Sequence, residues 1–434
     1  MKYSNNWQSL NTRPVPEWFS DAKFGIFIHW GIYSVPAYAP KGCYAEWYGY
    51  HCSNPDGNEN DRAYYEHHQK HYPGMRYNDF VSGFRAENFD ARQWVGLFAD
   101  AGARYMNLVS KHHDGFCMWG SKYSPNWNSV DVGPHRDFCA ELSEACEGSP
   151  VRFGVYHSIY EWFDPLYNAD PERYALQKLI PMMKELVEAY RPATLFTDGE
   201  WSHPSSVWHS EDFLAWLYNE SSVKDFIVPN DRWGSETRGR LGGNLTTEYG
   251  WLGAADGNSE MIDRVSEECR GIGASFGYNR FETAEDYLSV RELVTMLVDL
   301  VSRGSNFLLN VGPTADGRIP VVMEERLRGI GKWLRVNGEG VYGSRRYCES
   351  TTPDTVYTKR GGAVYAFMKK PPRGRVVFRD VPYFPGMSAA LLGCEKPLIV
   401  YEESGKAAVD FGVLYPDEID SEHVFTLRLT PAEG

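Results

Sequence analysis

The sequence has few of the features that assign a chain to a cellular class at once. No run approaches the roughly 18 apolar residues that a membrane-spanning helix needs. The first ten residues, MKYSNNWQSL, hold no apolar segment of the kind found in secretory signal peptides. We therefore expect a cytoplasmic protein, or a secreted or periplasmic one if its N-terminus was trimmed.

Basic residues are in the minority, with 44 Lys and Arg against 58 Asp and Glu and a formal net charge of −14. Binding to nucleic acid or to an anionic membrane relies on basic patches, so we expect neither as a partner. An acidic surface fits a protein that acts on a neutral substrate. No feature of the sequence indicates an oligomeric state.

The eight cysteines are scattered, and none belongs to a C-x-x-C pair. The pairs nearest in sequence are Cys43 with Cys52 and Cys139 with Cys146. This spacing gives little support to a disulfide framework or a zinc site and favours reduced thiols in a cytosolic protein. The histidines likewise form no H-x-H or H-E-x-x-H motif.

Length and aromatic content are the positive features of the composition. With 434 residues the chain is too long for one ordinary small domain and fits a (β/α)8 barrel with a smaller module. Aromatic residues make up 15% of the chain, including 14 Trp and 28 Tyr. Aromatic rings stack on the C–H faces of sugars, which favours a carbohydrate ligand, and the alternative interpretation is a core rich in aromatics.

Short apolar runs that end in polar or aromatic residues alternate with helix-like stretches over the first three quarters of the chain. The predicted strands lie within residues 23–31, 104–116, 152–162, 193–201, 226–234 and 306–313. The predicted helices, each with apolar spacing near 3.6, lie within residues 91–102, 172–192 and 289–304. Alternation of this kind predicts a parallel sheet, and six or more units favour a barrel over an open sheet.

The pattern changes after residue 343. Short alternating strands with Gly and Pro turns lie within residues 354–370, 374–381 and 423–431. This pattern predicts an antiparallel β-sandwich with its own core. We therefore expect a catalytic barrel over residues 1–343 and a β-sandwich over residues 344–434.

Polar side chains gather at the ends of the predicted barrel strands, where barrel enzymes carry their chemistry. These side chains are His29, His112, His113, Tyr156, Asp198, Arg232 and Asn310. So many functional groups at one edge of a sheet predict an enzyme.

The segment TDGEW, residues 197–201, ends a predicted strand with two acids. Asp198 and Glu200 share a face if the strand continues, and a retaining glycosidase needs two carboxyl groups about 5–5.5 Å apart. The two acids of such an enzyme flank the scissile bond, however, whereas neighbours on one strand end approach it from the same side. Asp198 is therefore the candidate nucleophile, and Glu200 is a supporting acid or a cap of the following helix. Trp201 belongs either to the pocket wall or to the core.

The second carboxylate should come from a later strand. A general acid works best where burial or a neighbouring charge favours its protonated form. Glu248 has aromatic neighbours in Tyr249 and Trp251, which makes it the candidate acid/base. Glu267 lies in a charged stretch typical of a solvated helix and is the reserve candidate.

The segment KHHDGF places His112 and His113 side by side. Neighbours on a strand point to opposite faces, so both can share a metal site only if the strand has already ended. Neutral imidazoles that hydrogen-bond to sugar hydroxyls fit the pattern better. The alternative is one histidine in the core and one in the site.

Two further motifs pair a polar residue with a tryptophan. In AEWYG, Glu46 can accept hydrogen bonds from hydroxyls and Trp47 can provide a stacking face, although an isolated Trp more often belongs to a core. In NDRWG, Arg232 either clamps a substrate oxygen or pairs with an acid.

Taken together, the motifs resemble glycoside hydrolase family 29, the α-L-fucosidases. The matching segments, in the family's order, are KFGIFIHWGIYSVPA, AEWY, SKHHDGFCMW, GPHRD, GVYHSIYEWFDP, TDGEW, NDRWG, SFGYNR and NFLLNVGPTADG. They span approximately residues 15–345. The resemblance implies a (β/α)8-like barrel followed by a C-terminal β-sandwich. It also implies retaining, exo-acting hydrolysis of terminal α-L-fucose from fucosylated glycans through a covalent fucosyl-enzyme intermediate.

The resemblance also implies roles for individual residues. Asp198 matches the family's nucleophile. The residues implied to line the fucose pocket are His29, Glu46, Trp47, His112, His113 and Tyr156, with Arg232 and Phe276 at further contact positions. No metal or cofactor is implied.

The acid/base of this family lies in a variable region after NDRWG. Glu248 in TTEY resembles the site in several members, although the proline often found before that Glu is absent. The segment SEEC, which holds Glu267, resembles a Trp-Glu segment of relatives but has Ser266 in place of Trp.

Three alternatives to a fucosidase stay open at this point. One is a catalytically inactive barrel that only binds carbohydrate, and the presence of Asp198 argues against it. Another is a metal-dependent hydrolase that uses His112, His113 and Asp198. The third is a hydrolase of a related sugar such as an α-L-galactoside.

Overall fold

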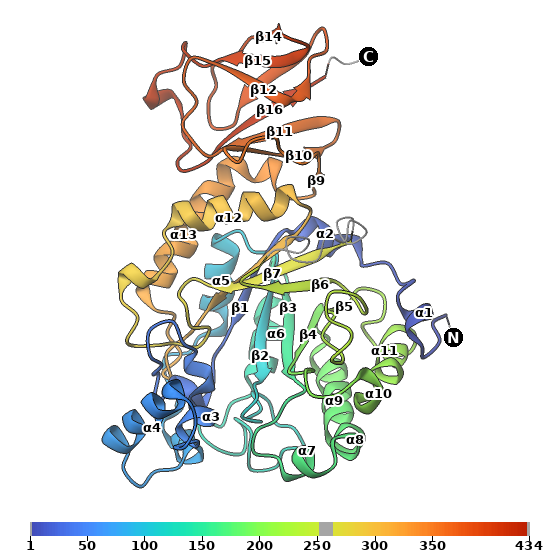
Figure 1. The fold of residues 1–434 in the computed structure, drawn as a ribbon, viewed down its shortest axis with the longest axis vertical. Coiled ribbons are helices and arrows are strands. Elements are labelled where there is room, and N and C mark those ends of the chain that lie inside the picture. The colour runs from blue at the N-terminus through green and yellow to red at the C-terminus, as the bar shows by residue number, and fades with distance from the viewer. Residues whose placement is uncertain (1, 251–263, 432–434) are drawn as a thin grey trace.

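Eight parallel strands form one curled sheet in the computed structural model, which describes residues 2–250 and 264–431 (Figure 1). The strands are β1 (Phe24–Ile28), β2 (Tyr105–Lys111), β3 (Arg152–Ser158), β4 (Thr194–Asp198), β5 (Val228–Pro229), β6 (Leu245–Glu248), β7 (Ser266–Gly271) and β8 (Asn306–Val311). Their order is β5-β4-β3-β2-β1-β8-β7-β6, so the first strand pairs with the last. This cyclic order confirms the predicted (β/α)8-like barrel.

The barrel has a seam, because no strand pairing joins β5 to β6 among the described residues. Two backbone hydrogen bonds bridge the seam just before β6, from Gly243 N to the Asn230 oxygen and from Asn244 N to the Pro229 oxygen, both at 3.1 Å. A Cβ added to Gly243 would lie 1.8 Å from the Pro229 oxygen. Glycine is therefore required where the chain crosses the seam.

Strands β6 and β7 lie outside the six segments in which the apolar pattern predicted strands. The segment Ser266–Gly271 contains two acids and an arginine, which obscure the strand pattern. Glu267 nevertheless lies inside the barrel, where it accepts a hydrogen bond from Tyr105, and Glu268 accepts one from Thr247 on β6. The expectation that Glu267 lies on a solvated helix is wrong, because local partners allow these acids to be buried in a strand.

The interior of the barrel is aromatic. Side chains of alternate residues on a strand share a face, so Phe196 and Asp198 both point inward from β4. Phe196 packs with Phe27 at a ring distance of 5.1 Å and with Tyr156 at 5.9 Å. These rings form an apolar floor below the carboxyl ends of the strands.

Helices cover the outside of the sheet (Figure 1). The longer ones are α4 (Glu59–His71), α5 (Ala91–Asp100), α6 (Phe138–Cys146), α9 (Ile180–Tyr190), α11 (Ser210–Asn219), α12 (Val290–Ser302) and α13 (Val321–Asn337). The shorter ones are α1 (Trp7–Leu10), α2 (Glu17–Ala22), α3 (Tyr48–Cys52), α7 (Pro165–Ala169), α8 (Pro171–Tyr174) and α10 (Ser205–Trp208). No helix among the described residues is long and apolar enough to cross a membrane.

The helix predicted over residues 172–192 is divided into three parts. A π-helical turn, Ala175–Leu179, separates α8 from α9. Pro181 lacks the N–H that a regular α-helix would use at the start of α9. The wide turn carries Lys178, whose side chain points toward the interior of the protein.

The C-terminal region consists of two antiparallel sheets, which confirms the predicted sandwich. Their strands are β9 (Arg345–Arg346), β10 (Thr355–Arg360), β11 (Ala363–Met368), β12 (Arg375–Pro382), β13 (Ser388–Leu391), β14 (Val400–Glu403), β15 (Lys406–Asp410) and β16 (Phe425–Thr430). Helices α12 and α13 lie between these sheets and the barrel (Figure 1). Trp333 of α13 shares a core with Phe367 and donates a hydrogen bond to the Val424 oxygen at 2.8 Å. The domain boundary after residue 343 stays a prediction.

Candidate active site

A cavity of about 440 Å³ lies at the carboxyl ends of the barrel strands. The predicted residues that line it are Asp198, Glu248, His29, Glu46, Trp47, His112, His113, Tyr156, Arg232 and Phe276. The structure therefore brings together residues spread over positions 29 to 276 of the sequence, whereas Asn310 at the end of the last strand is not among the lining residues. Glu267, the reserve acid, does not line this cavity within the described part of the chain.

Asp198 ends β4, and Gly199 turns the chain away with a φ of +79°. Arg232 Nη1 donates a hydrogen bond to Asp198 Oδ1 at 2.6 Å, and the Tyr156 hydroxyl donates to Oδ2 at 3.0 Å. Burial alone would raise the pKa of Asp198, but the charge of Arg232, the neighbouring His113 and the hydrogen bonds from Arg232 and Tyr156 together hold the pKa below its usual range. Asp198 is therefore an ionised carboxylate at the bottom of the cavity.

Arg232 follows β5 and is fully engaged by its neighbours. Its Nε donates to Thr246 Oγ1 at 3.1 Å, and Nη1 and Nη2 each lie 3.3 Å from Glu248 Oε2. Its guanidinium lies 4.8 Å from the centre of the Phe196 ring. Of the two roles considered for Arg232, the structure shows the pairing with acids.

Arg232 sets the spacing of the two candidate catalytic acids. Asp198 Oδ1 and Glu248 Oε2 contact the same Nη1 atom, at 2.6 and 3.3 Å. The two oxygens are thus no farther apart than these two distances together. That limit is compatible with the separation of about 5–5.5 Å between the carboxyl groups of retaining glycosidases.

Glu248 ends β6, and its side chain is 28% exposed, so solvent reaches it. Arg238 lies 3.9 Å from the same Oε2 atom. Tyr249, expected beside this acid, instead donates its hydroxyl to the Ala274 oxygen at 3.0 Å. Trp251, the other expected neighbour, lies outside the described residues.

Glu200 does not cap the following helix. The N-terminus of α10 is satisfied by Glu236, whose Oε1 accepts from Ser205 N at 3.1 Å. Glu200 is buried, and its Oε2 has no hydrogen-bond partner in the described part of the chain. Burial, reinforced by the charge of Asp198, raises the pKa of Glu200 to about 7. The prediction of a cap is wrong, since four residues separate Glu200 from the first residue of the helix.

Two cavity histidines are held as neutral hydrogen-bond acceptors. His29 Nδ1 lies 2.7 Å from Asn310 Oδ1, and the amide nitrogen of Asn310 donates to a backbone carbonyl. His113 Nδ1 lies 2.6 Å from Ser158 Oγ, whose proton goes to another carbonyl. Each Nδ1 must therefore carry the proton, which leaves each Nε2 as an acceptor. Burial lowers the pKa of His29 to about 3 and that of His113 to about 4.

His112 and His113 both line the cavity, because β2 ends at Lys111 and the chain leaves the strand pattern there. The alternative with one histidine in the core is therefore wrong. Burial lowers the pKa of His112 well below its usual value. Among the described residues, no three His, Cys, Asp or Glu side chains form a group that could hold a metal ion.

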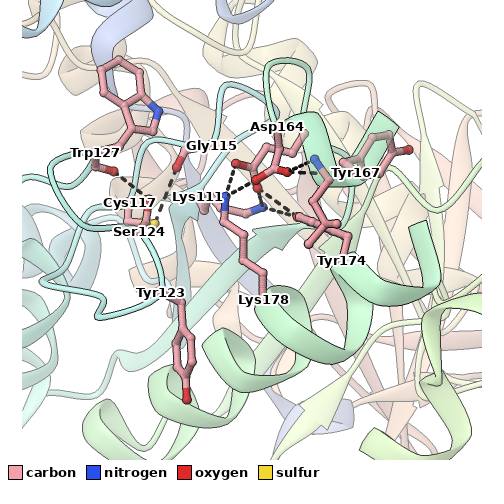
Figure 2. A network of polar contacts seen from close by, with 12 residues as sticks. Lys111, Gly115, Cys117, Tyr123, Ser124, Trp127, Asp164, Tyr167, Tyr174 and Lys178 are labelled. Carbon is pink, nitrogen blue, oxygen red and sulfur yellow. Dashed lines mark hydrogen bonds and ion pairs between the residues drawn. The ribbon is translucent and has the colours of Figure 1, made fainter. Parts of the chain in front are cut away.

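A buried charge cluster, made of Lys111, Glu161, Asp164 and Lys178, anchors the loop that carries these histidines (Figure 2). Lys111 Nζ lies 2.9 Å from Glu161 Oε2, and Lys178 Nζ lies 2.6 Å from both Glu161 Oε1 and Asp164 Oδ2. The Tyr174 hydroxyl donates to Glu161 at 2.9 Å. Burial opposes the charge of Glu161, but the two lysines outweigh it and hold its pKa below the usual range.

Glu46 and Trp47 form another wall of the cavity. Glu46 accepts hydrogen bonds from Gly277 N at 2.8 Å and from Ser275 Oγ at 3.4 Å, and burial raises its pKa to about 7. Trp47 stacks on Trp201, with ring centres 6.3 Å apart and planes 23° apart. Trp201 lines the cavity and is 44% exposed, so it belongs to the pocket wall and not to the core.

Several lining residues escaped the sequence analysis. Phe196 and Cys269 were detectable in principle, because each lies on the inward face of a strand, as Phe196 does two residues before Asp198. The others come mainly from residues 42–64, a segment of loops, short helices and the first part of α4 without strand periodicity. They include Tyr44, His51, Asn60 and Tyr64.

Comparisons with known proteins agree with this geometry. A family model described as alpha-L-fucosidase matches residues 1–339. An alpha-L-fucosidase of Dictyostelium discoideum is 39% identical over 100% of this chain and 96% of its own length. The Thermotoga maritima alpha-fucosidase in complex with a mechanism-based inhibitor superposes with a TM-score of 0.83 and 34% identity, over 99% of this chain and 100% of that one. Its complex with fucose gives the same TM-score at 33% identity and the same coverage.

Proposed function

Because this chain belongs to the α-L-fucosidase family and is therefore a glycoside hydrolase, we propose that it removes terminal α-L-fucose from fucosylated glycans by retaining, exo-acting hydrolysis. The observation that carries the proposal is the shared contact of Asp198 and Glu248 with Arg232 in a cavity at the carboxyl ends of the strands. Solved structures of the T. maritima relative with fucose and with a mechanism-based inhibitor support it.

In the first step, Asp198 is the nucleophile. A carboxylate oxygen of Asp198 attacks the anomeric carbon of fucose, and the bond from that carbon to the glycosidic oxygen breaks. Glu248 gives its proton to the departing oxygen, so that the rest of the glycan leaves as a neutral alcohol. The product of this step is a fucosyl ester of Asp198, with Glu248 left as a carboxylate.

In the second step, Glu248 accepts a proton from water. The water oxygen attacks the anomeric carbon, the ester bond to Asp198 breaks, and fucose leaves with its original α configuration. Arg232 contacts both acids and compensates their negative charge in both steps. Two inversions at one carbon account for the retention.

The cavity walls supply recognition. We assign His29, His113 and His112 to the fucose hydroxyls, since the free Nε2 atoms of the first two accept hydrogen bonds. Glu46 can donate or accept according to its protonation, because its pKa lies near 7. The aromatic faces of Trp47, Tyr156 and Phe276 suit the C–H groups and the methyl group of the sugar.

The test is hydrolysis of an aryl α-L-fucoside followed by proton NMR. Retention requires the α anomer of L-fucose to appear first and then mutarotate. Appearance of the β anomer first would contradict the retaining mechanism. An aryl α-L-galactoside serves as the matched control, because faster turnover of that substrate would identify a different sugar specificity. Activity lost on treatment with a chelator would favour a metal-dependent hydrolase instead.

A cytoplasmic location remains our proposal for the compartment. It is supported by the cysteines, all eight of which have free thiols in the structure. Fractionation of cells that express the chain tests this proposal, with the medium and the periplasm as the alternatives. We expect no nucleic-acid or membrane partner, on the basis of the net charge.

A further inference from the structure

The wall formed by the cavity-lining residues of segment 46–60 becomes more exposed from Glu46 to Asn60. Glu46 at its inner end is 2% exposed and accepts hydrogen bonds within the protein. Trp47 is half-buried, the His51 side chain is 21% exposed, and Asn60 is exposed. All four residues line the same cavity, so the wall leads from the buried end near Asp198 to the mouth.

His51 is fixed in one orientation at this mouth. Its Nδ1 lies 2.5 Å from Asp61 Oδ1. Asp61 is buried, and its second oxygen accepts from Asn58 N at 2.8 Å in the capping box of α4. The helix cap holds the carboxylate, and the carboxylate holds the imidazole with its proton on Nδ1. No described residue donates to or accepts from His51 Nε2, which is left available.

Aromatic neighbours immobilise the same ring. Tyr64 stacks on His51 with ring centres 4.7 Å apart and planes 28° apart. The ring of Trp47, the N-cap residue of α3, lies 5.9 Å away and comes four residues before His51 in the sequence. Trp47 also stacks on Trp201, which is 44% exposed. The mouth thus presents an ordered polar atom and an exposed aromatic residue, and the ring of Trp47 contacts both side chains.

We propose that His51, oriented by Asp61, and Trp201 form a binding site for the sugar to which fucose is linked. This inference rests on the proposed exo-fucosidase function. Fucose occupies the buried end with Asp198, so the next sugar must lie at the mouth. There His51 Nε2 accepts a hydrogen bond from one of its hydroxyls, and Trp201 stacks against its C–H face. An aglycone without hydroxyl groups cannot donate this hydrogen bond, so His51 does not strengthen its binding.

This difference between substrates is the basis of the test. The His51→Phe substitution keeps a flat ring against Tyr64 and Trp47 but removes the acceptor. We expect kcat/KM to fall about tenfold for at least one fucosyl disaccharide in a panel of α1,2, α1,3, α1,4 and α1,6 linkages, mainly through KM. The value for an aryl α-L-fucoside should stay within about twofold. His71→Phe, on the exposed side of α4, is the control and should alter neither substrate.

The role of Asp61 needs a separate readout, since it also caps a helix. Asp61→Asn should lower kcat/KM for the same disaccharide and lower it no further when combined with His51→Phe. Additive losses would show that Asp61 acts independently of His51 and would overturn its positioning role.

Two other outcomes overturn the subsite. Equal losses on both substrate types in His51→Phe would place His51 in the chemistry or in folding, and unchanged values on every disaccharide would exclude contact with the aglycone. If the unmodified chain hydrolyses neither substrate type, the fucosidase function itself fails, and the subsite fails with it. The thermal midpoint of each variant separates misfolding from loss of binding.

Discussion

Two groups of buried charge lie close to His112 and His113, and they differ in how completely they are satisfied. The charge cluster of Lys111, Glu161, Asp164 and Lys178 pairs two cations with two anions, at distances of 2.6 to 2.9 Å. The proposed catalytic group of Asp198, Arg232 and Glu248 shares the cation Arg232 between two acids and opens to the cavity. Glu200, buried beside it, has an oxygen without a hydrogen-bond partner among the residues that the structure describes.

The difference separates a structural network from a reactive one. A buried network in which every member is paired holds its loops in one arrangement. The charge cluster does this for the loop of His112 and His113, and Gly115 of that loop approaches Glu161 so closely that an added Cβ would lie 2.4 Å from it. The catalytic group keeps an ionised carboxylate open to a substrate, which a fully paired network cannot do.

Replacement of Asp198, the proposed nucleophile of the catalytic group, should cause the largest loss of activity. Asp198→Ala should lower kcat for an aryl α-L-fucoside by at least about 10⁴-fold, because it removes the carboxylate proposed to attack the anomeric carbon. Added azide should restore turnover and yield a fucosyl azide, since a small anion can enter the space left by the side chain. Near-normal activity without azide would contradict the assignment of Asp198 as the nucleophile.

Disruption of the charge cluster should mainly affect stability. Glu161→Gln leaves the buried Lys111 and the half-buried Lys178 with one acid and should lower the free energy of unfolding by about 3–5 kcal/mol. Urea denaturation measures the change. Glu422→Gln removes an exposed pair with Lys332 at 3.2 Å and serves as the control, with an expected change below about 1 kcal/mol. Equal midpoints for the two variants would show that the charge cluster is not structural.

The two candidate acids allow a matched comparison within the barrel. With a good leaving group, Glu248→Ala should keep rapid fucosylation and slow the second step by about 10²–10³-fold, because water then lacks its base. Azide should accelerate that step. Glu267→Ala should leave the burst and the steady state in their normal ratio, since Glu267 bonds to Tyr105 away from the cavity. The reverse pattern would assign the acid/base role to Glu267.

The smallest expected effect is the pH dependence caused by Glu200. Its pKa is raised to about 7 in the folded state, so the folded chain holds a proton that the unfolded chain has released above about pH 4.5. This contribution makes stability fall as pH rises from about 4.5 to 7. Glu200→Gln should flatten that fall and raise the free energy of unfolding at pH 8 by on the order of 1 kcal/mol.

Urea midpoints at pH 5 and pH 8 test the Glu200 prediction. Glu220→Gln, at the exposed end of α11, is the control and should leave the pH dependence unchanged. An unaltered slope in Glu200→Gln would mean that Glu200 is already ionised at neutral pH in the folded state.

Most of the barrel and its site was predictable because it depends on short sequence patterns, namely apolar strand segments and the polar residues at their ends. The predicted strands end at His29, His112, Asp198 and Arg232, and all four side chains line the cavity. The errors fall where tertiary partners override local pattern. The apolar pattern did not reveal β6 and β7, because charged residues interrupt it. In β7 these residues are acids that accept hydrogen bonds from Tyr105 and Thr247. No local signal identified His51.

The amino-acid sequence determined the alternation of strands and helices, the sandwich that follows, and the identity of Asp198 as the strand-end acid. These features depend on the periodicity of apolar residues and on the position of a side chain within its own strand. The tertiary structure decided which second acid meets Asp198, which face of the 46–60 wall opens to solvent, and that Glu200 is buried without a partner for its Oε2. Each of these depends on which distant segment packs against the residue, and only the closed barrel brings those segments together.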